Sequence, residues 1–298
     1  MFKIRHEFDK TMVECSSELL KHSENYPTYA DEGRIFSALC TGFDKSKGLT
    51  TDVGITIPMP HISMKFHERH GRDVEAIMCV GRYIQFKFIK TNGGIIPSRY
   101  AVQKDIYEYT LTNCLGVKIT GAVHNVSAMG LFIDIGAGVT ALIPLKYLST
   151  SHTVDTSTRA KEGEEFSAFL HSVENGRIVL NAVPMYGTFE ENMLRFKKGT
   201  VYPGRITSKH PYGTFIELAN NFVGLSSPVG DDLNVGDTVN TVITDINPTS
   251  TKVKLKVLSK CDEAPDNEPY GFASLLCGVK SWNYSPTVRF SYKGGIAL

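Results

Sequence analysis

Apolar and polar residues alternate in short runs along most of the chain, with the period of two that is typical of β-strands. The alternation is clearest at 83–88 and 252–256. Strands are also predicted at 35–40, 49–58, 82–89, 95–98 and 177–181. A strand with one polar and one apolar face suits a small closed barrel, which buries the apolar side chains and leaves no free sheet edge.

Helical patterns are few and short. The apolar positions in 7–21 indicate an N-terminal helix, and Pro27 and Gly33 are expected to close that segment. A further helical turn or two is predicted within 184–198, as a spacer between two strand-rich stretches. The predicted fold class is therefore all-β, with short helices at the N-terminus and in linkers.

One order of landmarks occurs three times, which indicates an internal repeat. Each copy opens with a glycine before an apolar strand, has a glycine at the start of its second strand and another before its fourth. The copies start about 85 residues apart by this alignment. The three sets are Gly33, Gly48 and Gly81; Gly121, Gly130 and Gly163; and Gly204, Gly213 and Gly236.

The repeat predicts tandem five-stranded barrels, with long loops at 61–75 and 152–165 between third and fourth strands. The tail carries a polar, proline-bearing linker and then Trp282, Tyr284 and Phe290. The predicted organisation is an N-terminal helical lead (1–30), a degenerate barrel (31–105), a barrel (114–184), a helical linker (185–197), a third barrel (198–260) and a C-terminal tail (261–298).

Composition narrows the class of protein. A hydrophobic content of 42% in 298 residues is ordinary for a globular protein, and the net charge of +1 gives no global attraction to nucleic acid. Six scattered cysteines suit a reducing compartment. No apolar run is long enough to span a membrane, and the N-terminus lacks the apolar core of a signal peptide, so an intracellular, cytoplasmic protein is expected.

Other chemistry has weak support. His61, His67 and His70 lie close in sequence but lack further metal ligands, so no metal site is predicted. The glycines at 93–94 and 136–138 lack the lysine and the following helix of a phosphate-binding loop, and hairpin turns are predicted there instead. No cofactor and no catalytic group of residues is predicted.

The second and third copies resemble the RNA-binding repeat of bacterial ribosomal protein S-one. The first copy resembles the same repeat in a degenerate form. The resemblance covers about 33–260. It implies tandem barrels of the oligonucleotide-binding (OB) fold in a non-catalytic, single-stranded RNA-binding protein. Such a protein would act in translation or messenger RNA handling, with the ribosome as a further partner.

The resemblance also implies the binding positions. The family places aromatic residues immediately before the second-strand glycine and two residues after it. The third copy has Tyr212 and Phe215 there, whereas the second has Met129 and Phe132, and the first has Lys47 and Thr50. A family histidine in the third strand is matched by His61, and a basic residue that opens the last strand is matched by Arg177 and Lys252.

Charge singles out the third copy. Residues 195–260 hold nine basic and five acidic side chains, a net charge of +4, whereas 116–183 hold five basic and six acidic ones, a net charge of −1. Core packing is the alternative for both phenylalanines, and a merely solvated strand face is the alternative for the lysines. The predicted RNA-binding residues are Tyr212, Phe215, Lys252, Lys254, Arg205, Phe132, Arg177 and His61.

A second hypothesis is a structural or assembly protein, of the kind a phage could encode, that uses its barrels and C-terminal tail for protein contacts or self-assembly. The near-zero net charge, the missing aromatics in the first copy and the aromatic tail favour it. An enzyme ranks third. The ribonucleases with this repeat carry a large catalytic domain beside it, and the three copies are expected to leave no room for such a domain in this sequence.

Overall fold

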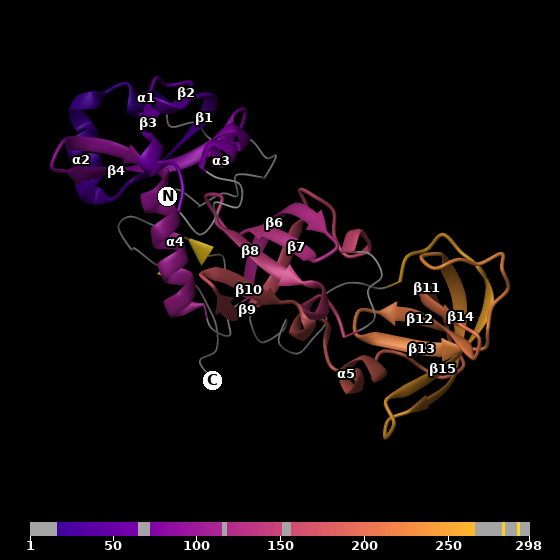
Figure 1. Cartoon of the computed structure of the whole chain (residues 1–298). Coiled ribbons are helices and arrows are strands. Elements are labelled where there is room, and N and C mark those ends of the chain that lie inside the picture. Colours follow the sequence, from indigo (N-terminus) through magenta and orange to yellow (C-terminus); the bar gives the residue numbers. More distant parts are fainter. Residues whose placement is uncertain are drawn as a thin grey trace.

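Three five-stranded units follow one another along the chain in the computed structural model, which describes residues 17–64, 72–114, 118–150, 156–265, 282–283 and 291–292 (Figure 1). We call them the first unit, the middle barrel and the third barrel. The first unit contains β1 (Ile35–Asp44), β2 (Gly48–Thr51), β3 (Thr56–Ile57), β4 (Tyr83–Thr91) and β5 (Gly94–Ser98). The middle barrel contains β6 (Lys118–Ser127), β7 (Gly130–Asp134), β8 (Thr140–Pro144), β9 (Glu165–Glu174) and β10 (Arg177–Asn181). The third barrel contains β11 (Val201–His210), β12 (Gly213–Ala219), β13 (Phe222–Ser226), β14 (Thr238–Asn247) and β15 (Lys252–Lys260).

The predicted all-β fold of tandem OB-type units is confirmed, with one difference in closure. The middle and third barrels close through parallel pairing of their last strand with their third, β10 with β8 and β15 with β13. The first unit has the equivalent strand order, β3-β2-β1-β4-β5, but its sheet is open. Its third strand has only two residues, so the expected barrel is a half-barrel there.

The glycines that open the second strands occupy one equivalent place in all three units. A Cβ atom at Gly48 or Gly130 would lie 2.0 Å from the carbonyl oxygen of Ile57 or Ile143, and one at Gly213 would lie 2.6 Å from that of Ser226. No side chain fits at such distances. These glycines therefore mark the close approach of the second strand to the third.

Backbone hydrogen bonds correct the alignment of the first unit. The N–H of the glycine before the fourth strand donates to the first strand in each unit: Gly81 to Cys40, Gly163 to Val123 and Gly236 to Ile206. These three acceptors are thus equivalent, and Ala38 takes the place of Gly121 and Gly204. The alignment of Gly33 with Gly204 was wrong by five residues, because Gly33 instead ends a helix in a left-handed conformation.

That helix lies at the N-terminal side of the first unit. The described elements are α1 (Ser17–Leu20), the 3-10 helix η1 (Ser23–Asn25) and α2 (Tyr26–Glu32). Pro27 lies in the first turn of α2. Backbone N–H groups in the first turn make no hydrogen bond within the helix, so proline is tolerated there. Pro27 therefore begins a helix and does not close one. The expected loop at 61–75 contains part of η2 (Met59–His61) and the start of α3 (Arg72–Cys79).

A longer helix, α4 (Arg99–Asn113), joins the first unit to the middle barrel and was not predicted (Figure 1). Val102 and Ile106 pack into the core of the middle barrel. Gln103 accepts from the N–H of Met64 and donates to the carbonyl of Ala137, at 3.1 and 3.0 Å. The helix is therefore held by both neighbours, and its apolar positions are not gathered on one face.

The spacer between the middle and third barrels is confirmed as helical. It contains η6 (Val183–Tyr186) and α5 (Phe189–Met193), after the short η4 (Leu145–Tyr147) and η5 (Thr156–Thr158) of the middle barrel. Thr188 and Glu191 form a capping box at the start of α5. Phe189 and Phe196 pack on Phe222, which fixes the spacer to the third barrel.

In the tail, β16 (Trp282–Asn283) pairs with β17 (Ser291–Tyr292), while Tyr284 and Phe290 lie outside the described residues. The turns predicted at 93–94 and 136–138 are confirmed, since each joins two antiparallel strands. Across the part of the chain that the structure describes, no helix is long and apolar enough to cross a membrane.

Candidate nucleic-acid interface

A row of outward-facing residues crosses the third barrel. The strand register places Phe215 between Ser208 and Leu225, and Leu225 beside Lys254. The neighbours along the strands, such as Ile216 and Leu255, are buried in the barrel core. Phe215 is only partly buried and Leu225 is 36% exposed, so this row forms an accessible outer face.

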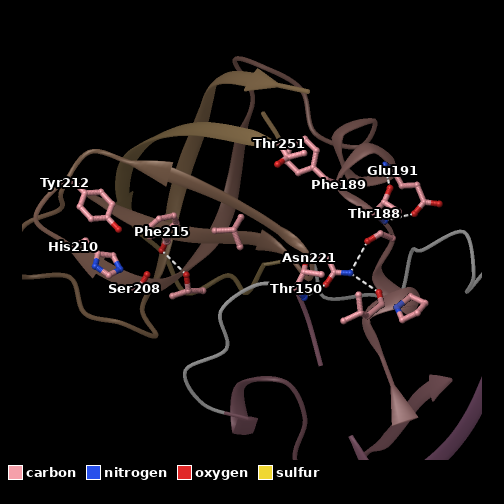
Figure 2. A pocket seen from close by; sticks show the side chains of 15 residues that line it. Thr150, Thr188, Phe189, Glu191, Ser208, His210, Tyr212, Phe215, Asn221 and Thr251 are labelled. Atoms are coloured by element: carbon pink, nitrogen blue, oxygen red, sulfur yellow. Dashed lines mark hydrogen bonds between the residues drawn. The ribbon is translucent and has the colours of Figure 1, made fainter. Parts of the chain in front are cut away.

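Three rings gather at one end of this row, and we call His210, Tyr212 and Phe215 the aromatic cluster (Figure 2). Tyr212 is 66% exposed and stacks on His210, with ring centroids 5.1 Å apart and an interplanar angle of 9°. Phe215 meets both rings edge-on, at 5.6 Å from His210 and 6.4 Å from Tyr212. The mutual packing orients the exposed rings before any ligand arrives.

Basic side chains lie on β15, two strands from Phe215 in the register of the third barrel. Lys252 and Lys254 are exposed, and Val253 between them is buried. Because Lys254 pairs with Leu225, which pairs with Phe215, the lysine lies on the same face as the ring. Cations on the same face as exposed rings are the combination that many proteins use to bind single-stranded nucleic acids.

Arg205 faces a different neighbour. It pairs with Glu217, which lies two residues after Phe215 on β12. Its guanidinium donates to the carbonyl of Thr158 at 3.1 Å. Thr158 belongs to η5 of the middle barrel. Arg205 therefore lies at the contact between the two barrels, away from the aromatic cluster.

The equivalent row of the middle barrel offers far less. Phe132 occupies the place of Phe215 but is 5% exposed, and Val179 takes the place of Lys254 and is 3% exposed. Burial of Phe132 contradicts the expectation that its ring is open for stacking, and favours the packing alternative. Met129 is 59% exposed at the place of Tyr212, and Arg177 is exposed at the start of β10.

The first unit carries an acid where the third barrel has His210. Asp44 pairs with Gly48 as His210 pairs with Gly213. Hydrogen bonds from the Ser46 hydroxyl and from the backbone N–H groups of Ser46 and Lys47 lower the pKa of the Asp44 carboxyl. It is thus negatively charged at neutral pH, which disfavours a phosphate there.

His61 lies in η2, beyond the short third strand, so its expected place on that strand was wrong. Its Nδ1 atom lies 3.2 Å from the hydroxyl of Ser98, the N-cap residue of α4. His67 and His70 fall outside the described residues. Among the residues that the structure describes, no three His, Cys, Asp or Glu side chains come together as a metal site.

A groove of about 1270 Å³ runs from the aromatic cluster to the junction of the two barrels. We call it the junction groove. Tyr212 and Phe215 of the third barrel and Thr188 and Phe189 of the spacer form part of its wall (Figure 2). Val223 of the third barrel lines it as well. The cluster is thus one end of a larger concave surface.

Asn221 holds the two barrels together at the floor of this groove. It lies in the turn between β12 and β13, is 8% exposed, and directs its amide away from its own barrel. Its nitrogen donates to the carbonyls of Val183 and Gly187 at 2.9 and 3.0 Å. Its oxygen accepts from the Ser149 hydroxyl and the Thr150 N–H at 3.1 and 2.8 Å.

A buried ion pair adds a second link. Arg159, which follows η5, donates to Glu217 on β12 at 2.8 Å, and the two side chains are 4% and 1% exposed. Arg159 also donates to the side chain of Asn220. A buried charge without its partner is costly, so this pair favours one arrangement of the two barrels.

Sequence reasoning missed His210, Phe189 and the inter-barrel contacts. His210 was within reach, because residues two apart on a strand share a face and Tyr212 was already selected. The dipeptide 220–221 is typical of a hairpin turn, but nothing in it indicates the surface that the turn meets. The ion pair joins residues far apart in sequence and leaves no local pattern.

Comparison with known proteins agrees with this architecture. Residues 115–181, the middle barrel, match the family model of the S1 RNA binding domain, and the predicted repeat of the ribosomal S-one type is confirmed there. The chain is 25% identical over 244 residues to a small ribosomal subunit protein bS1 homolog of Bacillus subtilis, covering 75% of this chain and 63% of that protein. It is 28% identical over 251 residues to the small ribosomal subunit protein bS1 of Staphylococcus haemolyticus, covering 76% and 62%.

The chain therefore spans less than two thirds of the length of these two relatives. A solved structure of a multidomain protein with nucleic acid binding domains from Streptococcus pneumoniae is 14% identical, with a TM-score of 0.26. The match covers 77% of this chain and 74% of the chain in that structure.

Proposed function

We propose that this chain is a non-catalytic, single-stranded RNA-binding protein of the ribosomal S1 type, and that the third barrel is its main binding surface. The observation that carries the proposal is the aromatic cluster: Tyr212 is 66% exposed and oriented by two other rings. Lys254 lies on the same outer face. The match of the middle barrel to the S1 RNA binding domain supports the choice of ligand.

The chemistry follows from what an unpaired base offers. A base can stack on an exposed ring, and each such contact is worth on the order of 1 to 3 kcal/mol. Every base has a flat face, so stacking by itself gives broad sequence tolerance. Lys252 and Lys254 would follow the phosphates, which makes the affinity depend on salt.

The middle barrel would add a weaker contact through Met129 and Arg177, both of which are exposed. Two sites on one chain raise each other's effective concentration, so modest sites together become a useful tether. Affinity should therefore increase with RNA length beyond the span of one barrel.

The context of action is inferred from likeness. Relatives named as small ribosomal subunit proteins support a role in translation or messenger RNA handling, with the ribosome as a further partner. The same likeness supports the cytoplasm as the place of action. It also supports binding without catalysis, since the family matched is named for RNA binding.

The test is the binding of a fluorescently labelled 12-nucleotide oligouridine, measured by anisotropy at rising salt. Replacing Tyr212→Ala together with Phe215→Ala should weaken binding by about 2 kcal/mol or more, roughly 30-fold. Met129→Ala, at the equivalent exposed place in the middle barrel, is the matched control and should cost far less. Absence of salt-dependent binding, or wild-type affinity in the double variant, would overturn the proposal.

We infer a protein contact or self-association through 261–298, because this stretch carries the aromatic residues of the chain end. Size-exclusion mass measurement of the full chain against a chain that ends at Lys260 tests it. A smaller assembly for the shortened chain is expected, and equal association states would contradict the inference.

A further inference from the structure

We propose that the junction groove binds a second stretch of the same RNA strand, next to the bases held by the aromatic cluster. This inference rests on the proposed function and extends it to a surface that two barrels build together. The groove is continuous with the cluster, because Tyr212 and Phe215 line one part of it and Phe189 and Thr251 line another (Figure 2). A strand stacked on the cluster therefore has a concave path to follow.

The size of the groove favours a polymer segment. Its volume of about 1270 Å³ exceeds the range of about 300 to 1,000 Å³ that is usual for small-molecule pockets. It also opens directly onto the exposed rings, whereas a pocket for one small molecule encloses most of its ligand. Several nucleotides match both features.

The chemistry of the walls suits bases and sugars. Phe189 is partly exposed, its ring centroid lies 5.2 Å from that of Phe222, and it lines the groove as a second aromatic position. Hydroxyl groups of Ser208 and Thr251 line it as well. Rings for stacking and hydroxyls for hydrogen bonds to base edges and 2′-hydroxyls are what single-stranded RNA recognition uses.

Charge indicates which way the phosphates face. Thr251 lines the groove, and Lys252 follows it as the first residue of β15, with Lys254 two residues further on. The phosphates would follow this basic edge while the bases turn toward Phe189. The one acid among the described lining residues, Glu191, already accepts from the N–H of Thr188 at 2.7 Å in the capping box.

The walls are held in place without RNA. Asn221 joins the third barrel to the middle barrel and spacer by four hydrogen bonds of its amide, and the Arg159–Glu217 pair is buried beside it. A pre-formed groove costs less ordering when a ligand binds. These residues therefore act as positioning groups for the groove.

The test changes one charge at the groove. Thr251→Glu and Thr251→Lys are a matched pair, because both place a long side chain at the same exposed, left-handed position. Ser259→Glu makes the same charge change as Thr251→Glu, near the other end of β15 and away from the residues that line the groove. The probes are labelled oligouridines of 4 and 12 nucleotides, with anisotropy as the readout.

We expect Thr251→Glu to weaken binding of the 12-nucleotide RNA about fivefold relative to Ser259→Glu, and Thr251→Lys to strengthen it, from one charge interaction near a phosphate. Binding of the 4-nucleotide RNA, held by the cluster alone, should change less than twofold. Equal effects of Thr251→Glu and Ser259→Glu on the longer RNA would overturn this inference and leave the proposed function standing. No binding of either RNA to the wild-type chain would overturn both.

Discussion

The middle and third barrels have the same strand order and register but different outer faces. At four equivalent places the middle barrel has Ser127, Met129, Phe132 and Val179 where the third has His210, Tyr212, Phe215 and Lys254. The family model matches the middle barrel, at 115–181, which lacks the stacked rings and the lysine at these places. Backbone likeness and ligand chemistry are thus separate properties, and the second must be read from individual side chains.

The first unit extends the series in the same direction. It lacks parallel closure, and it places the acid Asp44 where the third barrel has His210. Its glycines at 48 and 81 nevertheless occupy the same places as the corresponding glycines of the other two units. The scaffold has been kept throughout, while the features suited to RNA increase from the N-terminal unit to the C-terminal barrel.

The largest expected effect concerns the buried ion pair that joins the middle barrel to the third barrel. Arg159→Met leaves Glu217 buried without its partner and should lower the free energy of unfolding by about 3 to 5 kcal/mol. Denaturant unfolding measures the change. The double variant Arg159→Met with Glu217→Met removes both charges and should recover most of the loss. A single variant as stable as wild type would show that the barrels are not coupled through this pair.

A smaller effect is expected from the basic residues on the outer faces of the two barrels. Lys252→Gln with Lys254→Gln should weaken RNA binding about tenfold at low salt, and should reduce the salt dependence by a slope of about 1.4, since each single-strand phosphate contact contributes about 0.7. Arg177→Gln is the control in the middle barrel, with an expected slope change of at most about half as much. Equal slopes in all three proteins would mean that the phosphates bind elsewhere.

The smallest effect is a gain. Ser127→His with Met129→Tyr rebuilds the stacked pair of the third barrel on the middle barrel, at positions with the same strand register. One added stacking position should strengthen binding of a 12-nucleotide RNA by about 1 kcal/mol, roughly fivefold. Isothermal titration calorimetry measures it. Unchanged affinity would mean that exposed rings alone do not define the difference between the barrels.

Much of the fold was predictable because its signals are local. Alternation located strands such as β4 and β15, and the glycines at 48, 130 and 213 marked positions where no side chain fits. The alignment failed at Gly33, because a helix-ending glycine and a barrel glycine look alike in sequence. The helix α4 was missed because its stability depends on contacts with both neighbouring units.

The candidate site was predictable only in part. The pattern selected Tyr212 and Phe215 but could not distinguish Phe215, which stays accessible, from Phe132, which the structure buries. Arg205 has the right charge but meets the middle barrel at Thr158. Burial and inter-barrel contacts are set by residues distant in sequence, which alternation and spacing do not encode.

The most direct test of the central claim is ultraviolet crosslinking of a 12-nucleotide oligouridine to the full chain, with the crosslinked residues located by mass spectrometry. We predict that crosslinks concentrate on His210, Tyr212 and Phe215, with few in the middle barrel and fewer in the first unit. Crosslinks concentrated in the middle barrel or the first unit, with the aromatic cluster unlabelled, would contradict the account.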